Sequence, residues 1–241
     1  MIAAESARLA YDRVSAVVDL RAYAGGTAQS GDWAHGRASP AFIDAAASVA
    51  ALAPVGEGHV EALAADEFII VLAGRLEVEA SAGRLVLEAS KSGVIPAGTR
   101  FDWRAADGTL AIIASVPAAA PGDADGPVAI NESAKLTPSN PPLAELLIGP
   151  APLCRNHSDY RSANGAFVCG TWDSTPYHRR QTPYRHIELM HLLEGSVSFY
   201  DDNGRVTFKT GDVLLFVRGE GCAWHSEAHV KKIYATHRPA A

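Results

Sequence analysis

Short apolar runs alternate with turn residues along most of the chain. In the first half, from residue 45 to residue 116, these runs include FIIVLAG, LEVEA, RLVLEA and LAIIASV, with glycines between them. Runs of this length, recurring about every ten residues, are typical of short strands in an all-β sandwich or barrel. No run in either half has the pattern of a βαβ unit, a phosphate loop or a coiled coil.

The second half continues this pattern after a short predicted helix at LAELLIG. Its apolar runs include GAFVCGTW, HIELMHLLEG, SVSFY, DVLLF and VKKIYAT. Asn203-Gly204 lies between two alternating runs, and both residues tolerate the positive φ of a tight primed turn. This pair therefore predicts a β-hairpin.

The two halves share one frame of glycines, acids and aromatic residues. Every matched pair is separated by 121 residues: Glu67 and Glu188, Gly74 and Gly195, Gly98 and Gly219, Phe101 and Cys222, Trp103 and Trp224. A constant separation without gaps indicates that a whole domain-sized unit is duplicated. The Pro- and Gly-rich stretch PAAAPGDADGP divides the copies. We therefore predict an N-terminal domain at 1–118, a linker at 119–142 and a C-terminal domain at 143–241.

The repeated frame resembles the two-part signature of the cupin superfamily, G-x5-H-x-H-x3-4-E-x6-G followed by G-x5-P-x-G-x2-H-x3-N. Glu188-x6-Gly195 and Gly211-x7-Gly219 match it in the second half, and Glu67-x6-Gly74 and Pro96-x-Gly98 match it in the first. The chain thus resembles a bicupin of the RmlC-like jelly-roll type. The resemblance implies an all-β fold of two tandem cupin barrels, each a double-stranded β-helix, with few short helices.

The C-terminal half is most similar to the ureidoglycine-aminohydrolase-like group of cupins. That similarity implies an enzyme of amide or ureido nitrogen metabolism. At the metal-ligand positions of the signature, however, this half has Thr182, Tyr184 and Cys222 beside Glu188. The activity is therefore not carried over. In the N-terminal half the same positions hold Glu61, Leu63 and Phe101, so a degenerate barrel without a metal is expected there.

A metal site in the C-terminal barrel is one of two alternatives. The resemblance implies that three histidines and a glutamate hold a divalent ion inside the barrel. Glu188, His186, Cys222 and His178 would form a chemically acceptable set for Zn, Mn, Fe or Ni. The alternative without a metal is the favoured one. His178 lies in a polar loop segment, and Cys222 is typical of a small buried residue.

A site without metal would centre on Glu188. A carboxyl group that points into a barrel is costly to bury. One alternative is therefore a raised pKa and a general acid or base role, with His186 and Tyr184 beside it; the other is a hydrated position near the open end of the barrel. Further pocket residues are predicted at Cys222, Trp224, Met190, Phe216 and His178. For Arg179, Arg180 and Arg185 two alternatives stay open: contacts with a carboxylate substrate, or a plain solvated loop, which is the more common outcome for such a segment.

Three functions remain open from the sequence, and it leaves undecided whether the chain is an enzyme. The first is a small-molecule-binding bicupin, acting without metal through Glu188 on a small polar, carboxylate or ureide substrate. The second is a metal-dependent hydrolase or dioxygenase with the metal in the C-terminal barrel. The third is a noncatalytic sensing or assembly module with two degenerate pockets. A homodimer is compatible with each.

Charge, cysteine content and hydropathy bear on the classes of partner and on the cellular location that we expect. The formal net charge is -6 and no basic stripe occurs, so nucleic acid is not an expected partner. Three cysteines without CxxC spacing favour a reduced, cytoplasmic location. No apolar run approaches the length of a membrane span or signal peptide, so no membrane partner is expected.

Overall fold

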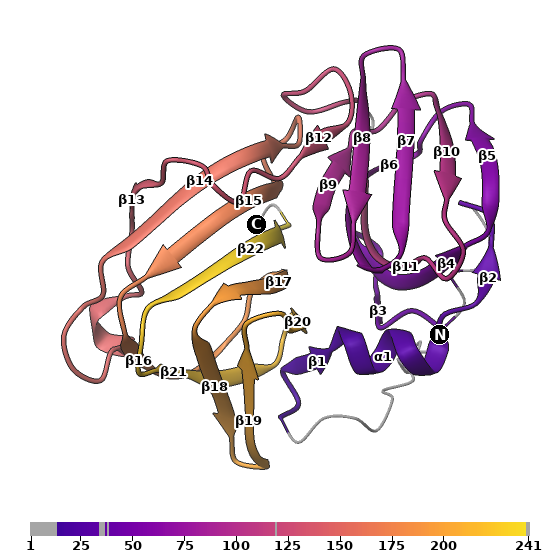
Figure 1. Ribbon diagram of the computed structural model, residues 1–241. Coiled ribbons are helices and arrows are strands. Elements are labelled where there is room, and N and C mark those ends of the chain that lie inside the picture. Colours follow the sequence, from indigo (N-terminus) through magenta and orange to yellow (C-terminus); the bar gives the residue numbers. More distant parts are fainter. Residues whose placement is uncertain (1–13, 34–36, 38, 119, 240–241) are drawn as a thin grey trace. The chain divides into compact units, whose positions relative to one another are not determined.

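The chain folds into two compact units built almost entirely from strands. The computed structural model describes residues 14–33, 37, 39–118 and 120–239. Among these, the first unit comprises residues 20–128, and the second comprises residues 14–19 and 129–239 (Figure 1). The expected all-β class is confirmed, and in the described part of the chain no helix is long and apolar enough to cross a membrane.

The first unit is a barrel of two sheets that follows the short helix α1 (Leu20–Thr27). Its larger sheet has the order β12-β9-β6-β11-β4-β2, with β3 paired to β4. These strands are β2 (Ser30–Gly31), β3 (Phe42–Ile43), β4 (Ser48–Pro54), β6 (Ala65–Ala73), β9 (Ser92–Ile95), β11 (Leu110–Pro117) and β12 (Val128–Ala129). The smaller sheet, ordered β5-β10-β7-β8, contains β5 (Gly56–Val60), β7 (Arg75–Ala80), β8 (Gly83–Glu88) and β10 (Phe101–Ala105).

Alternation along the strands builds the core of this first unit. In β10, Phe101, Trp103 and Ala105 are buried, whereas Asp102 and Arg104 between them are exposed. Successive side chains of a strand point to opposite faces, so one face of the smaller sheet joins the apolar core and the other meets solvent. The core also takes residues from β6, β9 and β11 of the larger sheet.

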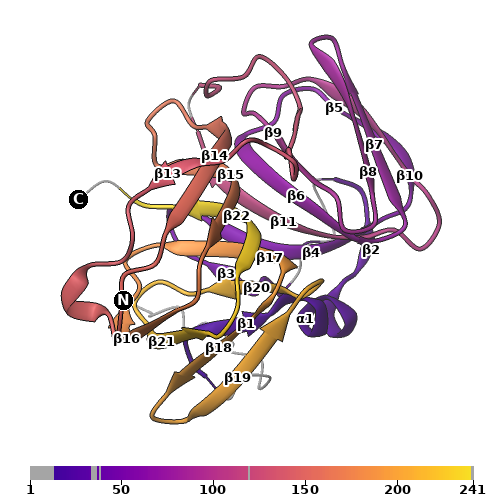
Figure 2. The same ribbon diagram turned by 60° about the vertical axis from the view of Figure 1, so that its left-hand side comes forward.

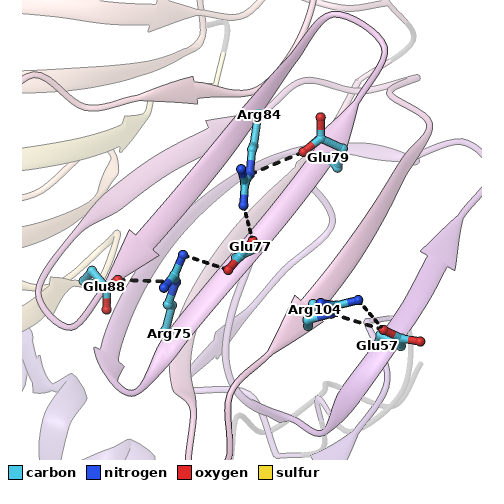
Figure 3. Close-up of polar contacts among 7 residues, drawn as sticks. All are labelled: Glu57, Arg75, Glu77, Glu79, Arg84, Glu88 and Arg104. Carbon is cyan, nitrogen blue, oxygen red and sulfur yellow. Dashed lines mark hydrogen bonds and ion pairs between the residues drawn. The ribbon is translucent and has the colours of Figure 1, made fainter.

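The outer face of the smaller sheet carries a row of ion pairs (Figure 3). Arg84 bridges Glu77 and Glu79, with nitrogen–oxygen distances of 2.5 and 3.4 Å. Arg75 similarly joins Glu77 to Glu88, and Arg104 pairs with Glu57 on β5. Cross-strand pairs of this kind favour the observed register, although each exposed pair contributes little free energy.

We expect the substitution Arg84→Ala to change the melting temperature only slightly, and less at high salt than at low salt. Mobile ions screen exposed charges, and water already solvates both partners well. Thermal unfolding of wild type and variant at low salt and at about 1 M NaCl measures the effect, where the screening length is about 3 Å. A large loss of stability that persists at high salt would contradict this view of the ion-pair row.

The second unit is also a barrel of two sheets. The larger sheet has the order β1-β20-β17-β22-β15-β14-β13, and the smaller has the order β16-β21-β18-β19. The larger sheet contains β1 (Val17–Asp19), β13 (Thr137–Ser139), β14 (Cys154–Arg161), β15 (Phe167–Ser174), β17 (Ile187–Glu194), β20 (Val213–Phe216) and β22 (Val230–His237). The smaller contains β16 (Tyr177–Pro183), β18 (Ser196–Asp201), β19 (Gly204–Lys209) and β21 (Gly221–Ser226).

The unit boundaries differ from the sequence prediction in two places. Strand β1 comes from the predicted N-terminal domain, yet it pairs antiparallel with β20 of the second unit (Figures 1 and 2). The predicted linker at 119–142 contains β12 and β13, and the short 3-10 helix η1 (Ala144–Leu146) follows it. Local patterning does not reveal β1's partner, because strand pairing between distant segments leaves no periodic signal in the chain.

The predicted hairpin at Asn203-Gly204 is present, but its turn differs. Strands β18 and β19 pair antiparallel, with Asp201 opposite Gly204. Asp202 and Asn203 are therefore the two turn residues, and neither has a positive φ. The Asp201 carboxylate accepts hydrogen bonds from the backbone N–H groups of Asn203 and Gly204, at 2.8 and 3.2 Å. This side-chain cap replaces the primed turn that the sequence predicted.

Candidate functional site

A cavity of about 910 Å³ lies within the second unit, between residues of both its sheets. On β17, Glu188 and Met190 line it from alternate positions, and on β22 Lys232, Tyr234 and Thr236 do the same. The period of two along each strand explains this, since every second side chain faces the barrel interior. Both strands thus deliver polar groups into an otherwise apolar barrel.

Glu188 forms an ion pair with a lysine inside this cavity. The ammonium Nζ of Lys232 lies 2.8 Å from Oε1 of Glu188. His186 reaches the other carboxylate oxygen, with Nε2 3.4 Å from Oε2. The side chains of Glu188 and Lys232 are 14% and 7% exposed, so water screens their attraction only weakly.

Aromatic rings and a thioether surround the Lys232 ammonium group. Nζ lies 4.7 Å from the ring centroid of Trp172 and 5.3 Å from that of Trp224. It also lies 3.1 Å from Sδ of Met190. A cation over an aromatic face is stabilised electrostatically, and the gain is larger where water is excluded. The ion pair, the two indole rings and the thioether therefore hold the end of the Lys232 side chain in place.

The expectation of a raised pKa for Glu188 is wrong. Burial by itself raises this pKa, but the Lys232 charge and the His186 hydrogen bond outweigh it and hold the pKa of Glu188 well below its usual range. An opposite charge at close range stabilises the ionised form of a carboxyl group. Glu188 is therefore a carboxylate at neutral pH and is not a proton-donating acid.

Tyr184 and Arg179 form a second polar pair in the cavity lining. The guanidinium Nη2 of Arg179 donates hydrogen bonds to the Tyr184 hydroxyl at 2.8 Å and to the Cys222 carbonyl at 3.2 Å. Its central carbon lies 4.9 Å from the Tyr184 ring centroid. Burial raises the pKa of Tyr184, partly offset by the Arg179 charge, so the phenol keeps its proton. On its other side, Tyr184 stacks on Phe216 with 4.1 Å between ring centroids.

Positive charge dominates the cavity. Glu188 is the one carboxylate among its described lining residues. The other charged side chains in the lining are cations, namely Arg161, Arg179, Arg185, Lys232 and Arg238. Because Lys232 is paired with Glu188, Arg179, Arg185 and Arg238 give the lining more positive than negative charge. Such a lining attracts anions.

The structure brings together only some of the sequence-predicted pocket residues. Glu188, His186, Tyr184, Met190 and Trp224 all line the cavity. Cys222 and Phe216 do not; both are fully buried in the apolar core of the barrel. His178 is also outside the cavity: its Nε2 contacts the Tyr200 hydroxyl, and its ring lies 4.8 Å from that of His225.

The four residues predicted as metal ligands, Glu188, His186, Cys222 and His178, are therefore not brought together. His178 and Arg179 are neighbours on β16, so their side chains point to opposite faces, and only Arg179 lines the cavity. Among the described residues, no three or more His, Cys, Asp or Glu side chains are grouped so that they could hold a metal ion. The expectation that His178 approaches Glu188 from a neighbouring strand is wrong for this reason.

Cys222 is expected to resist thiol reagents in the folded protein. Burial raises the pKa of its thiol to about 12, so the reactive thiolate is scarce at neutral pH. Cys154 and Cys169 are buried as well. We expect Ellman's reagent to label none of the three rapidly in the native state and all three in denaturant. Rapid labelling of Cys222 in the native state, located by peptide mass spectrometry, would contradict the core placement.

Two important residues were missed in the sequence. The repeated frame does not include Lys232, although the sequence carries a signal for it: Lys232 alternates with apolar or aromatic residues, Val230 and Tyr234, on one face of a predicted strand. A lysine on the inward face of a predicted strand is unusual enough to mark a site. Arg179 was considered only with its neighbours Arg180 and Arg185, and the alternation along β16 separates it from Arg180.

The matching glutamate of the first unit lies in a different environment. Glu67 is buried, and its carboxylate accepts hydrogen bonds from Nε1 of Trp33 at 2.8 Å and from the Ser115 hydroxyl at 2.7 Å. Arg37 pairs with both carboxylate oxygens, at 2.5 and 3.1 Å. Trp33 also packs edge-on against Phe101, with ring centroids 5.1 Å apart. Side chains of the unit itself thus satisfy Glu67.

Comparison with known proteins agrees with this architecture. Residues 161–234 match the family model described as the EutQ-like cupin domain. A protein of unknown function from Pseudomonas syringae pv. tomato str. DC3000, which belongs to the DUF861 family, shares 30% identity and a TM-score of 0.80. The alignment covers 88% of this chain and 93% of that one. The chain belongs to the DUF861 cupin family.

A second solved structure is similar to this DUF861 cupin in fold only. The Cupin 2 conserved barrel domain protein from Leptotrichia buccalis has a TM-score of 0.57 at 11% identity, with 96% of this chain and all of that one covered. None of the curated proteins compared with the chain matches it significantly. These similarities confirm the cupin fold, and neither of the two proteins has an activity in its description.

The residues of this DUF861 cupin do not fit the metal that cupin resemblance implies. His186, Glu188 and Cys154 are the ligand-type side chains in the cavity lining, and the Lys232 ammonium lies against the Glu188 carboxylate. An ion bound at Glu188 would sit beside that ammonium, and like charges at such a distance repel strongly in a buried site. Three protein ligands are the usual minimum for a catalytic zinc, and no three His, Cys, Asp or Glu side chains of the described residues are grouped closely enough to supply them.

Proposed function

We propose that the second barrel binds a small molecule with a carboxylate group, and that it does so through Arg179 without a metal ion. The observation that carries this proposal is the state of the Arg179 guanidinium. It is held in the cavity wall by Tyr184, yet its Nε has no hydrogen-bond partner among the described residues. No Asp or Glu of the described chain forms an ion pair with it.

A partly buried guanidinium group whose Nε is buried without a hydrogen-bond acceptor, and which has no acidic partner, is unfavourable in the empty protein. The group offers several N–H donors in a planar fork that matches the two oxygens of a carboxylate. A bound carboxylate would supply both the missing charge and the missing acceptors. The neighbouring cations Arg161, Arg185 and Arg238 in the cavity lining would add favourable potential for an anion.

The other side of the cavity suits a polar, uncharged group of the same ligand. Glu188 offers carboxylate oxygens to N–H donors, as an amide or ureide group would provide. The Tyr234 hydroxyl, 3.0 Å from the Ser158 hydroxyl, adds a further donor or acceptor. His186 lies beside Glu188 in the same lining and offers a ring nitrogen for a hydrogen bond. We therefore assign the site to a small carboxylate that also carries an amide, ureide or carbonyl group.

The substitution Arg179→Met tests this assignment. We expect it to weaken binding of the best ligand from a panel of carboxylates and ureides by about 10-fold to 100-fold, because a charge-assisted hydrogen-bonded pair contributes about 1.5–3 kcal/mol. Arg180→Met is the matched control: Arg180 is the next residue on β16, is exposed and lies outside the cavity lining. Thermal shift selects the ligand and isothermal titration calorimetry measures the affinity.

The control separates a specific contact from general attraction. Equal losses in Arg179→Met and Arg180→Met would show that only overall charge matters, and unchanged affinity in both would contradict the role of Arg179. Amide analogues of the ligand that lack the carboxylate should bind wild type weakly. They should bind Arg179→Met no worse than they bind wild type, because the lost contact is one they never made.

A further inference from the structure

Both barrels place a side-chain cation against the glutamate of the cupin frame. In the first unit the cation is the guanidinium of Arg37, which contacts both oxygens of Glu67. In the second it is the ammonium of Lys232 at Oε1 of Glu188. The two glutamates are equivalent by the constant separation of 121 residues. The same carboxylate position is therefore neutralised in both copies.

The two cations do not come from equivalent positions. At the same separation, Lys232 corresponds to Ala111, and Arg37 corresponds to Ser158. The two cations therefore reach the equivalent carboxylates from different positions in the two barrels. In contrast, the neighbours across the sheet are equivalent: Ser115 is paired in register with Glu67, and Thr236 with Glu188. The strand pairing around the glutamate is thus the same in both barrels, whereas the cation beside the carboxylate comes from a different position in each.

The path of the Lys232 side chain shows how the charge reaches Glu188. Lys232 lies opposite Leu192 on β17, further along that strand than Glu188. Its side chain runs back across the barrel interior past Sδ of Met190 and ends at the carboxylate. Trp172 and Trp224 cover the ammonium group. The cation is thus held in place by packing as well as by charge.

We infer that Lys232 replaces the metal ion of metal-dependent cupins as the fixed cation of the second barrel. A divalent ion in such a site neutralises the glutamate and presents a positive charge to an oxygen of the ligand. The ammonium group does the first directly, and its remaining N–H groups can donate hydrogen bonds to a ligand oxygen. A preorganised donor in a water-poor site stabilises negative charge that develops on such an oxygen.

The chemical class of group that this cation takes is a carbonyl or carboxylate oxygen. Lys232 holds that oxygen as a hydrogen-bond donor and not as a nucleophile, since its nitrogen is already engaged by the Glu188 carboxylate and the two indole rings. The inference concerns the cation at Glu188 and stands independently of the ligand contact proposed for Arg179. Its test therefore uses metal ions and stability, not ligand affinity.

The experiment compares wild type with Lys232→Arg, Lys232→Met and Glu188→Gln. Each protein is incubated with Zn²⁺, Ni²⁺ or Mn²⁺, desalted and analysed for metal content, and its melting temperature is measured with and without EDTA. We expect wild type to retain only substoichiometric metal, the same amount as Glu188→Gln, and to melt at the same temperature in EDTA. Lys232→Arg should melt close to wild type because it keeps a cation, whereas Lys232→Met should melt markedly lower.

Two outcomes would overturn the inference. One equivalent of metal retained by wild type and lost in Glu188→Gln would show that the carboxylate holds a metal ion. Equal melting temperatures for wild type, Lys232→Arg and Lys232→Met would show that the positive charge is not required. Lys232→Met can fail to fold. In that case a folded Lys232→Arg still shows that the positive charge is required, because the arginine keeps this charge and the methionine does not. The metal content of wild type then shows whether an ion is bound as well.

Discussion

Replacing Lys232 by methionine is expected to lower the free energy of unfolding by about 3–5 kcal/mol. Methionine keeps most of the apolar stem but leaves the Glu188 carboxylate buried without its cation, and the loss of one partner of a buried ion pair has a cost of this size. The double variant Lys232→Met/Glu188→Gln should recover much of the loss, since no uncompensated charge remains. Chemical denaturation of wild type, both single variants and the double variant measures the coupling energy.

Lys231→Met is the matched control for this substitution. Lys231 is the adjacent residue on β22, is only partly buried and lies outside the cavity lining. Its replacement should change stability by at most about 0.5 kcal/mol, as for most surface substitutions. A loss for Lys231→Met as large as that for Lys232→Met would assign the effect to the strand as a whole. A negligible loss for Lys232→Met would show that the pair contributes little.

The same pair predicts the pH dependence of the Lys232→Met effect. Because the folded pKa of Glu188 is lower than its unfolded value, the ionised pair stabilises the protein above the ordinary carboxyl pKa of 4.5, and this stability falls as pH drops below that value. In Lys232→Met the buried carboxyl instead prefers its proton. The difference in unfolding free energy between wild type and variant should therefore be largest near neutral pH and narrow below about pH 4.

The second large effect is expected for Gly195→Ala. Gly195 has φ +80°, and a Cβ added there would lie 2.2 Å from the backbone oxygen of His229. The left-handed conformation alone costs a residue with a side chain about 1–2 kcal/mol. Removing the clash requires a backbone shift at the start of β22, the strand that carries Lys232. We expect a total loss above about 2 kcal/mol and weaker ligand binding.

Gly219→Ala separates the two contributions. Gly219 also has a positive φ, +92°, but an added Cβ would meet no atom within 4 Å. This variant should lose only the conformational part, about 1–2 kcal/mol. Equal losses for Gly195→Ala and Gly219→Ala would show that the close approach to His229 is easily relieved. Denaturant titration of both variants gives the comparison.

The sequence predicts the fold better than the site, for a physical reason. Glycines such as Gly74 and Gly195 recur at a fixed separation because the backbone conformation at those turns excludes other residues, and this constraint is visible along the chain. The strands follow from alternation in the same way. Both signals are local, so they survive without knowledge of which strands pair.

The site depends on contacts between distant strands. Glu188 was found because it belongs to the repeated frame, but its state depends on Lys232, 44 residues further along. A raised pKa was the correct expectation for a buried carboxyl without a partner and wrong for one with an ammonium at 2.8 Å. His178 is not a site residue because successive side chains of β16 point to opposite faces. The cavity is lined by its neighbour Arg179, and His178 points away from it.

A crystal structure of the second barrel's ligand complex tests the central claim most directly. The protein is crystallised with the best carboxylate of the panel in the presence of Zn²⁺, and anomalous scattering is recorded at the zinc edge. We predict carboxylate oxygens within hydrogen-bond distance of the Arg179 guanidinium, the Lys232 ammonium at Glu188, and no anomalous peak in the cavity. An anomalous peak coordinated by Glu188 and His186, with Lys232 displaced, would contradict the account.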